Sequence, residues 1–216
     1  MMTLQQAKER ARLATVQLPT TGGQGVLVPG GFVLTAAHCT AWTISGGMAL
    51  GDYCLEEIIT PSGHNFRLEV SAIEPVSDVA ALASPDDQVF YDDAAAFDAF
   101  CEATTPVRVS STDFDVEVPV PVHILTPSGA WLHAQATRHG LPGALPGGTV
   151  WITPERGIAS GSSGGPVIDA GGRLVGIVSW SAARVGAHDG RMARPRLALP
   201  VWVWRHIQAA SPEGAH

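Results

Sequence analysis

The sequence is poor in cysteine, in positive charge and in long apolar runs. Its 216 residues hold three cysteines, and 13 Lys and Arg stand against 20 Asp and Glu, which gives a formal net charge of −7. A small, odd number of cysteines does not make a disulfide framework and is typical of a reducing compartment. The negative charge argues against nucleic acid or an acidic membrane surface as the main partner.

Segments that could span a membrane or direct secretion are also missing. No apolar run reaches the ~18 residues that a membrane helix needs. Lys8, Arg10 and Arg12 interrupt the first residues, where a signal peptide would carry its apolar core. We therefore expect a cytoplasmic protein that makes no membrane contact.

What the chain does contain is apolar residues, glycine and proline. Apolar residues make up 45% and charged residues 15%, which is a globular composition. The 24 glycines and 16 prolines are spread along the chain and favour many turns between short elements. This pattern predicts an all-β fold rather than a helical bundle.

About twelve segments have the length and composition of strands. They fall into two groups, 14–18, 25–28, 31–35, 48–55, 66–73 and 79–82 in the first, and 107–110, 116–125, 131–138, 150–153, 167–169, 174–180 and 197–199 in the second. Between the groups, residues 86–102 carry six acidic side chains among alanines and phenylalanines, and we interpret them as an acidic connection with at most a helical turn.

The two ends of the chain differ from this pattern. Residues 4–13 fit either a short helix or an exposed arm, and 201–210 fit a closing helix. We divide the chain into a first part, 1–104, and a second part, 105–216.

A glycine-rich segment, Gly161 to Pro166, surrounds Ser163. A serine hydroxyl is a weak nucleophile at neutral pH, so it needs an adjacent base and a site for the negative charge that forms on the attacked carbonyl. The glycines let the backbone bend tightly and direct the N–H groups of Gly161 and Ser163 toward one point. An ordinary glycine-rich turn has the same composition. This segment alone therefore does not distinguish a catalytic serine from a structural turn.

Two further side chains could complete such a site. His38 ends an apolar segment, and an imidazole titrates near neutrality and can take and return a proton. Asp78 opens an apolar strand and could accept from the second imidazole nitrogen, which fixes the tautomer. Taken singly, a buried histidine and an exposed loop acid are the plainer interpretations. Asp86 and Asp87 are rivals to Asp78, although no apolar strand directly follows them.

Together these motifs resemble those of trypsin-fold (chymotrypsin-like, S1-type) serine proteases. Residues 35–39, Thr-Ala-Ala-His-Cys, match the family's histidine motif, and 161–166 match Gly-Asp-Ser-Gly-Gly-Pro except at Ser162. Residues 77–82 resemble its Asp-Ile-Ala-Leu-Leu segment, and 178–180 resemble the strand that lines the primary specificity pocket. The resemblance extends from about Val16 to the closing helix.

The resemblance implies two packed antiparallel β-barrels with the active site between them. The arm and the first barrel would occupy 1–104, and the second barrel and a C-terminal helix 105–216. It implies His38 as general base, Asp78 as the residue that orients it and Ser163 as nucleophile. The N–H groups of Gly161 and Ser163 would form the oxyanion hole, and Ser179 would support Asp78.

Departures from the family pattern narrow this expectation. Secreted members carry Asp where this chain has Ser162, and that Asp pairs with an amino terminus made by cleavage. No Ile-Val-Gly-Gly segment is present here, so the chain is more similar to bacterial, HtrA-like members that need no such cleavage. Cys39 has no cysteine at the family's usual disulfide spacing, and we interpret Cys39, Cys54 and Cys101 as buried apolar thiols.

The specificity pocket is expected to be small and apolar. By its position before Ser163, the resemblance assigns its floor to Gly157, where members that cleave after basic residues have Asp. Its other residues would be Ile158, Ala159, Trp180 and Ser181, and Asp189 is the one nearby acid that could reach into it. Since no His or Cys pair has metal-ligand spacing, we expect no metal and no cofactor.

Two other functions are compatible with parts of the sequence. Gly-Ser-Ser-Gly-Gly also fits the Gly-x-Ser-x-Gly motif of α/β-hydrolase esterases, but that fold needs alternating helices and the order Ser, Asp, His. The other alternative function is that of a protein with the protease fold that is catalytically silent or is activated by a partner. A partner that restrains or activates a cytoplasmic protease could use residues 4–13 or the acidic connection. The expected substrate is a protein or peptide.

Overall fold

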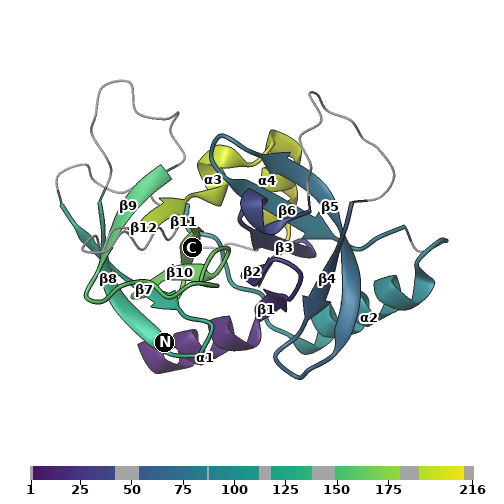
Figure 1. Cartoon of the computed structure of the whole chain (residues 1–216), viewed down its shortest axis with the longest axis horizontal. Coiled ribbons are helices and arrows are strands. Elements are labelled where there is room, and N and C mark those ends of the chain that lie inside the picture. The colour runs from purple at the N-terminus through teal and green to yellow at the C-terminus, as the bar shows by residue number, and fades with distance from the viewer. Residues whose placement is uncertain are drawn as a thin grey trace.

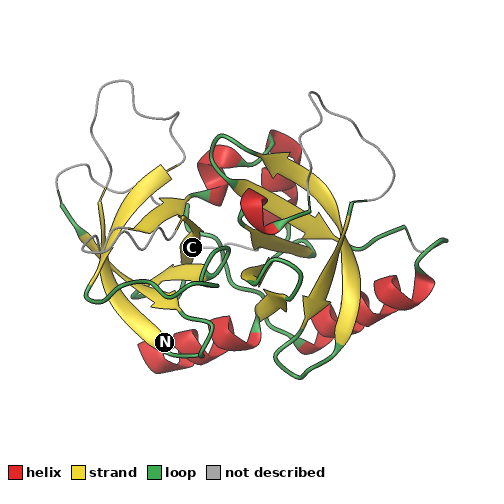
Figure 2. Cartoon of the chain, viewed as in Figure 1, coloured by secondary structure: helices red, strands yellow, loops and turns green. Residues whose placement is uncertain are grey.

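The computed structural model describes residues 2–41, 54–86, 88–111, 118–137, 149–180 and 190–211. Two closed antiparallel barrels lie side by side, and helices occupy the periphery (Figures 1 and 2). The predicted class, an all-β fold of two barrels with a C-terminal helix, is therefore confirmed. No helix among the described residues is both long and apolar enough to cross a membrane.

The first barrel is built from the strands that precede the acidic segment. These are β1 (Thr15–Leu18), β2 (Gly23–Val28), β3 (Phe32–Thr35), β4 (Leu55–Ile59), β5 (Asn65–Glu74) and β6 (Val79–Ala83). Their order around the barrel is β1-β2-β3-β6-β5-β4, and the pairing of Gln17 with Ile59 closes it. β3 and β6 are neighbours, which matters for the site because the histidine and aspartate motifs lie at their ends.

The second barrel repeats this arrangement with the later strands. These are β7 (Val120–Leu125), β8 (Trp131–Thr137), β9 (Thr149–Pro154), β10 (Pro166–Asp169), β11 (Leu174–Trp180) and β12 (Gly190–Ala193). Their order is β10-β11-β12-β9-β8-β7. The segment that carries Ser163 connects β9 to β10 and therefore belongs to this barrel.

Each barrel is filled by branched apolar side chains from its strands, and β2, β3 and β6 are buried along almost their whole length. Leu34, Ile58 and Leu82 are fully buried in the first barrel, and Ile152 and Val178 in the second. Each such side chain contributes about 1.5–3 kcal/mol when it is removed from water. The apolar pattern that predicted the strands is thus the pattern that fills the cores.

The helices confirm one of the two interpretations left open for residues 4–13. They form α1 (Leu4–Leu13), which begins with a capping box between Thr3 and Gln6 and buries Ala7 and Ala11. The 3₁₀ turn η1 (Ala37–Cys39) follows β3, and α3 (Pro195–Ala198) and α4 (Val201–Ala209) end the described chain. α4 agrees with the predicted closing helix.

The acidic connection is more helical than the sequence predicted. It contains α2 (Tyr91–Ala103), a helix of 13 residues, so helices are not confined to the ends of the chain. Asp92 and Asp93 lie in its first turn, where acids are favourable against the helix dipole. Phe97 is buried and packs on Phe66 of β5, with ring centroids 6.1 Å apart.

Two strand predictions also need correction, and a third lies mostly outside the described residues. Residues 197–199 are not a strand, because α3 begins with a proline at its first turn and takes up most of them. Residues 107–110 make only an isolated bridge, Val109 with Leu174, and β12 was not predicted. The strand expected at 48–55 lies mostly outside the described residues, and the structure has β4 at Leu55–Ile59 instead.

Candidate active site

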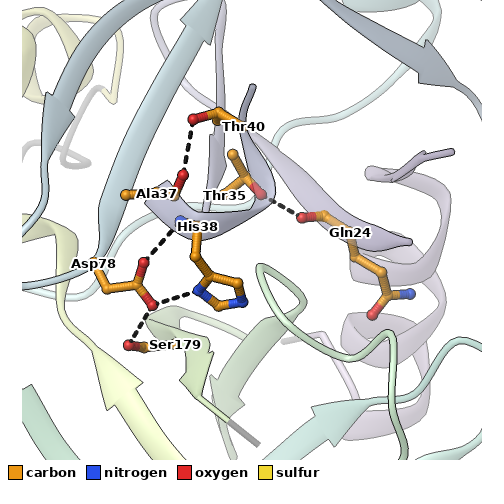
Figure 3. Close-up of polar contacts among 7 residues, drawn as sticks. All are labelled: Gln24, Thr35, Ala37, His38, Thr40, Asp78 and Ser179. Atoms are coloured by element: carbon orange, nitrogen blue, oxygen red, sulfur yellow. Dashed lines mark hydrogen bonds and ion pairs between the residues drawn. The ribbon is translucent and has the colours of Figure 1, made fainter. Parts of the chain in front are cut away.

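The predicted catalytic side chains come from both barrels and meet in one cleft. His38 lies on η1 after β3, Asp78 directly precedes β6, and Ser163 lies in the turn before β10. The cleft has a volume of about 680 Å³, and its lining includes these three residues together with Gly161 and Ser179. Since β3 pairs with β6, the first barrel presents His38 beside Asp78 (Figure 3).

Asp78 holds His38 at two points. The Nδ1 atom of His38 lies 2.8 Å from Oδ2 of Asp78, and the backbone N–H of His38 donates to Oδ1 at 2.9 Å. The imidazole side chain is 44% exposed and the carboxylate 16%, so the ring faces the cleft while its partner is covered. This geometry places the Nδ1 proton on the Asp78 side and leaves Nε2 free to accept a proton.

Ser179 provides a third contact to the same carboxylate. Its hydroxyl donates to Oδ2 of Asp78 at 2.8 Å, and Ser179 is fully buried on β11 (Figure 3). Because Ser179 belongs to the second barrel and Asp78 to the first, this bond crosses between the barrels. The carboxylate is therefore oriented by both halves of the molecule.

The backbone at Asp78 has an unusual conformation. Its φ is 58°, and among the described residues it is the only one besides glycine with a positive φ. Such a conformation costs about 1–3 kcal/mol for a residue with a side chain. The hydrogen bonds to His38 and Ser179 hold the carboxylate of Asp78 in this conformation.

The electrostatics of the pair favour a charged imidazole. The hydrogen bond from Asp78 and the side chain of Cys39 raise the pKa of His38 to about 10, although partial burial lowers it. An imidazolium is the species that His38 becomes when it takes a proton from a nucleophile. The site thus favours the protonated imidazole, and only the neutral fraction of His38 at a given pH can act as a base.

The turn that carries Ser163 depends on its glycines. Gly161 and Gly164 have φ values of +84° and +77°, which L side chains rarely adopt. A Cβ on Gly161 would lie 2.8 Å from the carbonyl oxygen of Gly22, and one on Gly164 would overlap the carbonyl oxygen of Gln24. The glycines therefore let the turn pack directly against the first barrel.

Hydrogen bonds fix this turn from two sides. The carbonyl of Ser163 accepts from the N–H of Gln24 at 2.8 Å, and the N–H of Gly164 donates to Val178 at 2.6 Å. Within the described part of the chain, the N–H groups of Gly161 and Ser163 make no hydrogen bond. Two free N–H donors, one two residues before Ser163 and one on Ser163 itself, are what an oxyanion hole requires.

The three cysteines are free, and their burial differs from the expectation. Cys39 is buried as predicted, whereas Cys54 and Cys101 are only partly buried. Desolvation raises the pKa of the Cys101 thiol to about 12 and also raises that of Cys54, so both thiols stay protonated near neutral pH. Cys39 lines the cleft, and a Cβ on Gly23 would lie 2.5 Å from its Sγ atom.

The residues proposed for the specificity pocket are not brought together in the described cleft. Gly157 and Ala159 are exposed, and Ile158 packs in the core of the second barrel. None of the three is among the described residues that line the cleft. The side chain of Trp180, and Ser181 and Asp189 entirely, lie outside the described residues.

The remaining sequence candidates also have definite places. Asp86 accepts from the N–H of Gln88 ahead of α2 and does not line the described cleft, while Asp87 lies outside the described residues. Ser162 is fully buried, and its hydroxyl has no partner among the described residues. Over the same residues, no three His, Cys, Asp or Glu side chains cluster in a way that could hold a metal ion.

Several cleft residues were missed from the sequence. They are Thr21, Gly22, Gly23, Pro75, Val76 and Ser160. Pro75 and Val76 directly precede the aspartate motif and Ser160 precedes the serine motif, so proximity to those motifs was a usable signal. Thr21 to Gly23 had no such signal, because their place in the cleft follows from the pairing of β2 with β3.

Comparison with solved structures identifies the fold of this chain. The chain has the trypsin-like double-barrel fold of chymotrypsin-like serine proteases, as its motifs predicted. No protein-family model matches the sequence, and no curated protein matches it either.

Among the solved structures that resemble it are bacterial proteases. The Rv3671c protease of M. tuberculosis in its active form is 19% identical, with 97% of this chain and 85% of that chain covered and a TM-score of 0.59. The inactive form of the same protease is also 19% identical, with coverage of 97% and 93% and a TM-score of 0.57. The serine endoprotease of Yersinia pestis is 16% identical, with coverage of 96% and 67% and a TM-score of 0.58.

Proposed function

We propose that this protein is a serine endopeptidase that hydrolyses peptide bonds through His38, Asp78 and Ser163. The observation that carries the proposal is the hydrogen-bonded chain from Ser179 to Asp78 to His38, which ends in the cleft that Ser163 lines. The structural neighbours named above are proteases, which agrees with this proposal.

In the first half of the reaction, the Ser163 hydroxyl attacks the scissile carbonyl carbon. Its proton passes to Nε2 of His38, and the resulting imidazolium is stabilised by Asp78. The carbonyl oxygen becomes an oxyanion that the free N–H groups of Gly161 and Ser163 would bind. The imidazolium then protonates the leaving amine, the C–N bond breaks, and an acyl-enzyme forms on Ser163.

In the second half, water replaces the amine. Nε2 of His38 takes a proton from the attacking water, and the carboxylic acid product leaves as the Ser163 hydroxyl is re-formed. No cofactor or metal is needed, because the base, the nucleophile and the oxyanion donors are all part of this chain.

The substrate is proposed to be a protein or peptide with a small or medium-sized apolar residue before the cleaved bond. This preference rests on the sequence resemblance and on the absence of Asp at position 157, since Gly157, Ile158 and Ala159 do not line the described cleft. We further propose a cytoplasmic, bacterial-type enzyme that needs no cleaved amino terminus, since Ser162 offers no charge for such an ion pair.

A second candidate, a protease-fold protein that a partner activates, is favoured by one observation. Among the described residues, Ser163 makes no side-chain hydrogen bond to His38. Catalytic hydrogen bonds are often loose in free enzymes and tighten when ligand binds. The two candidates therefore differ in whether the purified chain reacts alone.

Covalent labelling with a fluorophosphonate, read by intact mass, tests the proposal. We expect wild type to gain one adduct and Ser163→Ala to gain none, because the reagent needs an activated serine and an oxyanion hole. Labelling of both proteins would place the reactive group elsewhere. No labelling of wild type would contradict constitutive activity and favour the partner-activated candidate.

A further inference from the structure

Gln24 is a buried amide that reaches from the first barrel to the nucleophile turn of the second. It lies on β2 and is 1% exposed, and its Oε1 atom has no hydrogen-bond partner among the described residues. Buried polar atoms in folded proteins are nearly always paired, so an unpaired amide directly behind a catalytic turn calls for a physical explanation.

The backbone of Gln24 already connects two parts of the site. Its N–H donates to the carbonyl of Ser163 at 2.8 Å, and its own carbonyl accepts from Oγ1 of Thr35 at 2.6 Å (Figure 3). Thr35 ends the strand that leads to His38. The position of Gln24 is therefore fixed relative to both the base and the nucleophile.

The Gln24 side chain occupies the space that a side chain at Gly165 would need. A Cβ on Gly165 would overlap Oε1 of Gln24 and would lie 2.8 Å from the carbonyl oxygen of Ser162 and 3.2 Å from that of Leu125. Three oxygens thus surround one point, although none can donate to another. Rotation of the amide by half a turn about its Cγ–Cδ bond places the NH₂ group there and changes the shape very little.

We propose that Gln24 is a positioning residue for the oxyanion hole, with its NH₂ group donating to the carbonyls of Ser162 and Leu125. The carbonyl of Ser162 and the N–H of Ser163 belong to one planar trans peptide, in which they point in opposite directions. A donor that fixes the Ser162 carbonyl therefore fixes the direction of the Ser163 N–H. This inference rests on the proposed function.

The rest of the turn explains why such a donor is needed. The Ser162 carbonyl also accepts from the N–H of Gly165 at 2.9 Å, which closes the turn but spans a glycine. Ser162 itself carries no charge and its hydroxyl has no described partner. Gln24 would add to this internal bond a second donor that comes from the first barrel.

The test compares Gln24→Met with wild type and with a matched control, Gln17→Met. Met has nearly the length and volume of Gln and lacks the donor, and Gln17 is the cross-strand neighbour of Gln24 on β1. We expect Gln24→Met to lower kcat and the fluorophosphonate labelling rate by ~10–100-fold, since misplaced oxyanion donors act on the transition state. KM and Tm should stay close to those of wild type, and Gln17→Met should match wild type throughout.

Gln24→Glu keeps the proposal testable if Gln24→Met does not fold. Its carboxyl can donate to a carbonyl only when protonated, so the ratio of its labelling rate to that of wild type should rise as the pH falls. Taking the ratio at each pH removes the titration of His38, which both proteins share. A pure space-filling role would give a ratio that does not change with pH.

The outcomes distinguish a failure of the role proposed for Gln24 from a failure of the proposed function. A folded Gln24→Met with wild-type kcat and labelling rate, or a flat pH ratio for Gln24→Glu, overturns the role of Gln24 while the proposed function stands. A wild type that labels no faster than Ser163→Ala overturns the proposed function and this inference with it.

Discussion

Replacing Asp78 with Asn is the most informative change at the base, because the structure gives Asp78 two separate tasks. One is to accept a hydrogen bond from the Nδ1–H group of His38 at 2.8 Å. The other is to raise the pKa of that imidazole. An amide of the same shape can keep the backbone contact at 2.9 Å through its oxygen. Its NH₂ group then faces Nδ1, which forces the proton onto Nε2, where the base must be free.

We expect Asp78→Asn to lower the plateau rate of fluorophosphonate labelling by about 10⁴-fold, since the wrong tautomer cannot accept the serine proton. The two plateaus are compared because each is reached only above the pKa of that protein's own His38. The pKa of His38 should fall from about 10 toward its usual range, because the hydrogen bond to Asp78 is the largest cause of its elevation. The residual rate should therefore reach its plateau at lower pH than in wild type. Stopped-flow or quenched labelling between about pH 5 and 11 measures both effects against reference pKa values.

Asp86→Asn is the matched control for this experiment. It removes the same charge from a residue that does not line the described cleft. The Asp86 side chain accepts instead from the backbone N–H of Gln88. We expect its labelling rate and pH profile to match those of wild type. The assignment would be refuted if Asp78→Asn stayed within about 10-fold of wild type, or if Asp86→Asn were the inactive variant.

The other predictions concern the thiol beside the base, the catalytic pair and helix α2. Cys39→Ala should move the acidic limb of kcat/KM to lower pH, because the Cys39 side chain raises the pKa of His38 and the base is active only when neutral; an unchanged limb would contradict this. Ser163→Ala and His38→Ala should each abolish nearly all turnover, and the double variant should be little worse than either, as kcat measurements would reveal. Phe97→Ala should destabilise the fold by about 3–5 kcal/mol in urea unfolding, because Phe97 is buried against Phe66. A loss below about 1 kcal/mol would mean that α2 does not depend on this contact.

The parts of the site that the sequence predicted are those in which chemistry dictates residue type locally. His38 follows an apolar strand, Asp78 precedes one, and Ser163 sits among glycines that its turn requires. Each of these signals is contained in a few consecutive residues. The barrels were predictable for a similar reason, since short apolar runs between glycine and proline turns indicate buried strands.

The missed features depend on contacts between distant residues. Helix α2 has an acidic, alanine-rich sequence whose charges suggest a solvated linker, and the packing of Phe97 on β5 is visible only in the folded chain. The short helix α3 contains the apolar residues 197 and 198, which alone resemble a strand. Gln24 looks like an ordinary strand residue, because its contact with Gly165 exists only after the two barrels dock.

Docking of the barrels and formation of the catalytic site are therefore one physical event in this protein. The proposed base and its carboxylate come from the first barrel, and the proposed nucleophile and its N–H donors come from the second. Two polar contacts join them at the site, from Ser179 to Asp78 and from Gln24 to Ser163. Apolar packing joins the barrels as well, because Ile168, Leu174 and Ile177 of the second barrel lie in the same buried cluster as the core of the first. A shift between the barrels would therefore disturb this shared core together with both polar contacts. Any agent that changed how the barrels dock would thus control the reaction without entering the cleft.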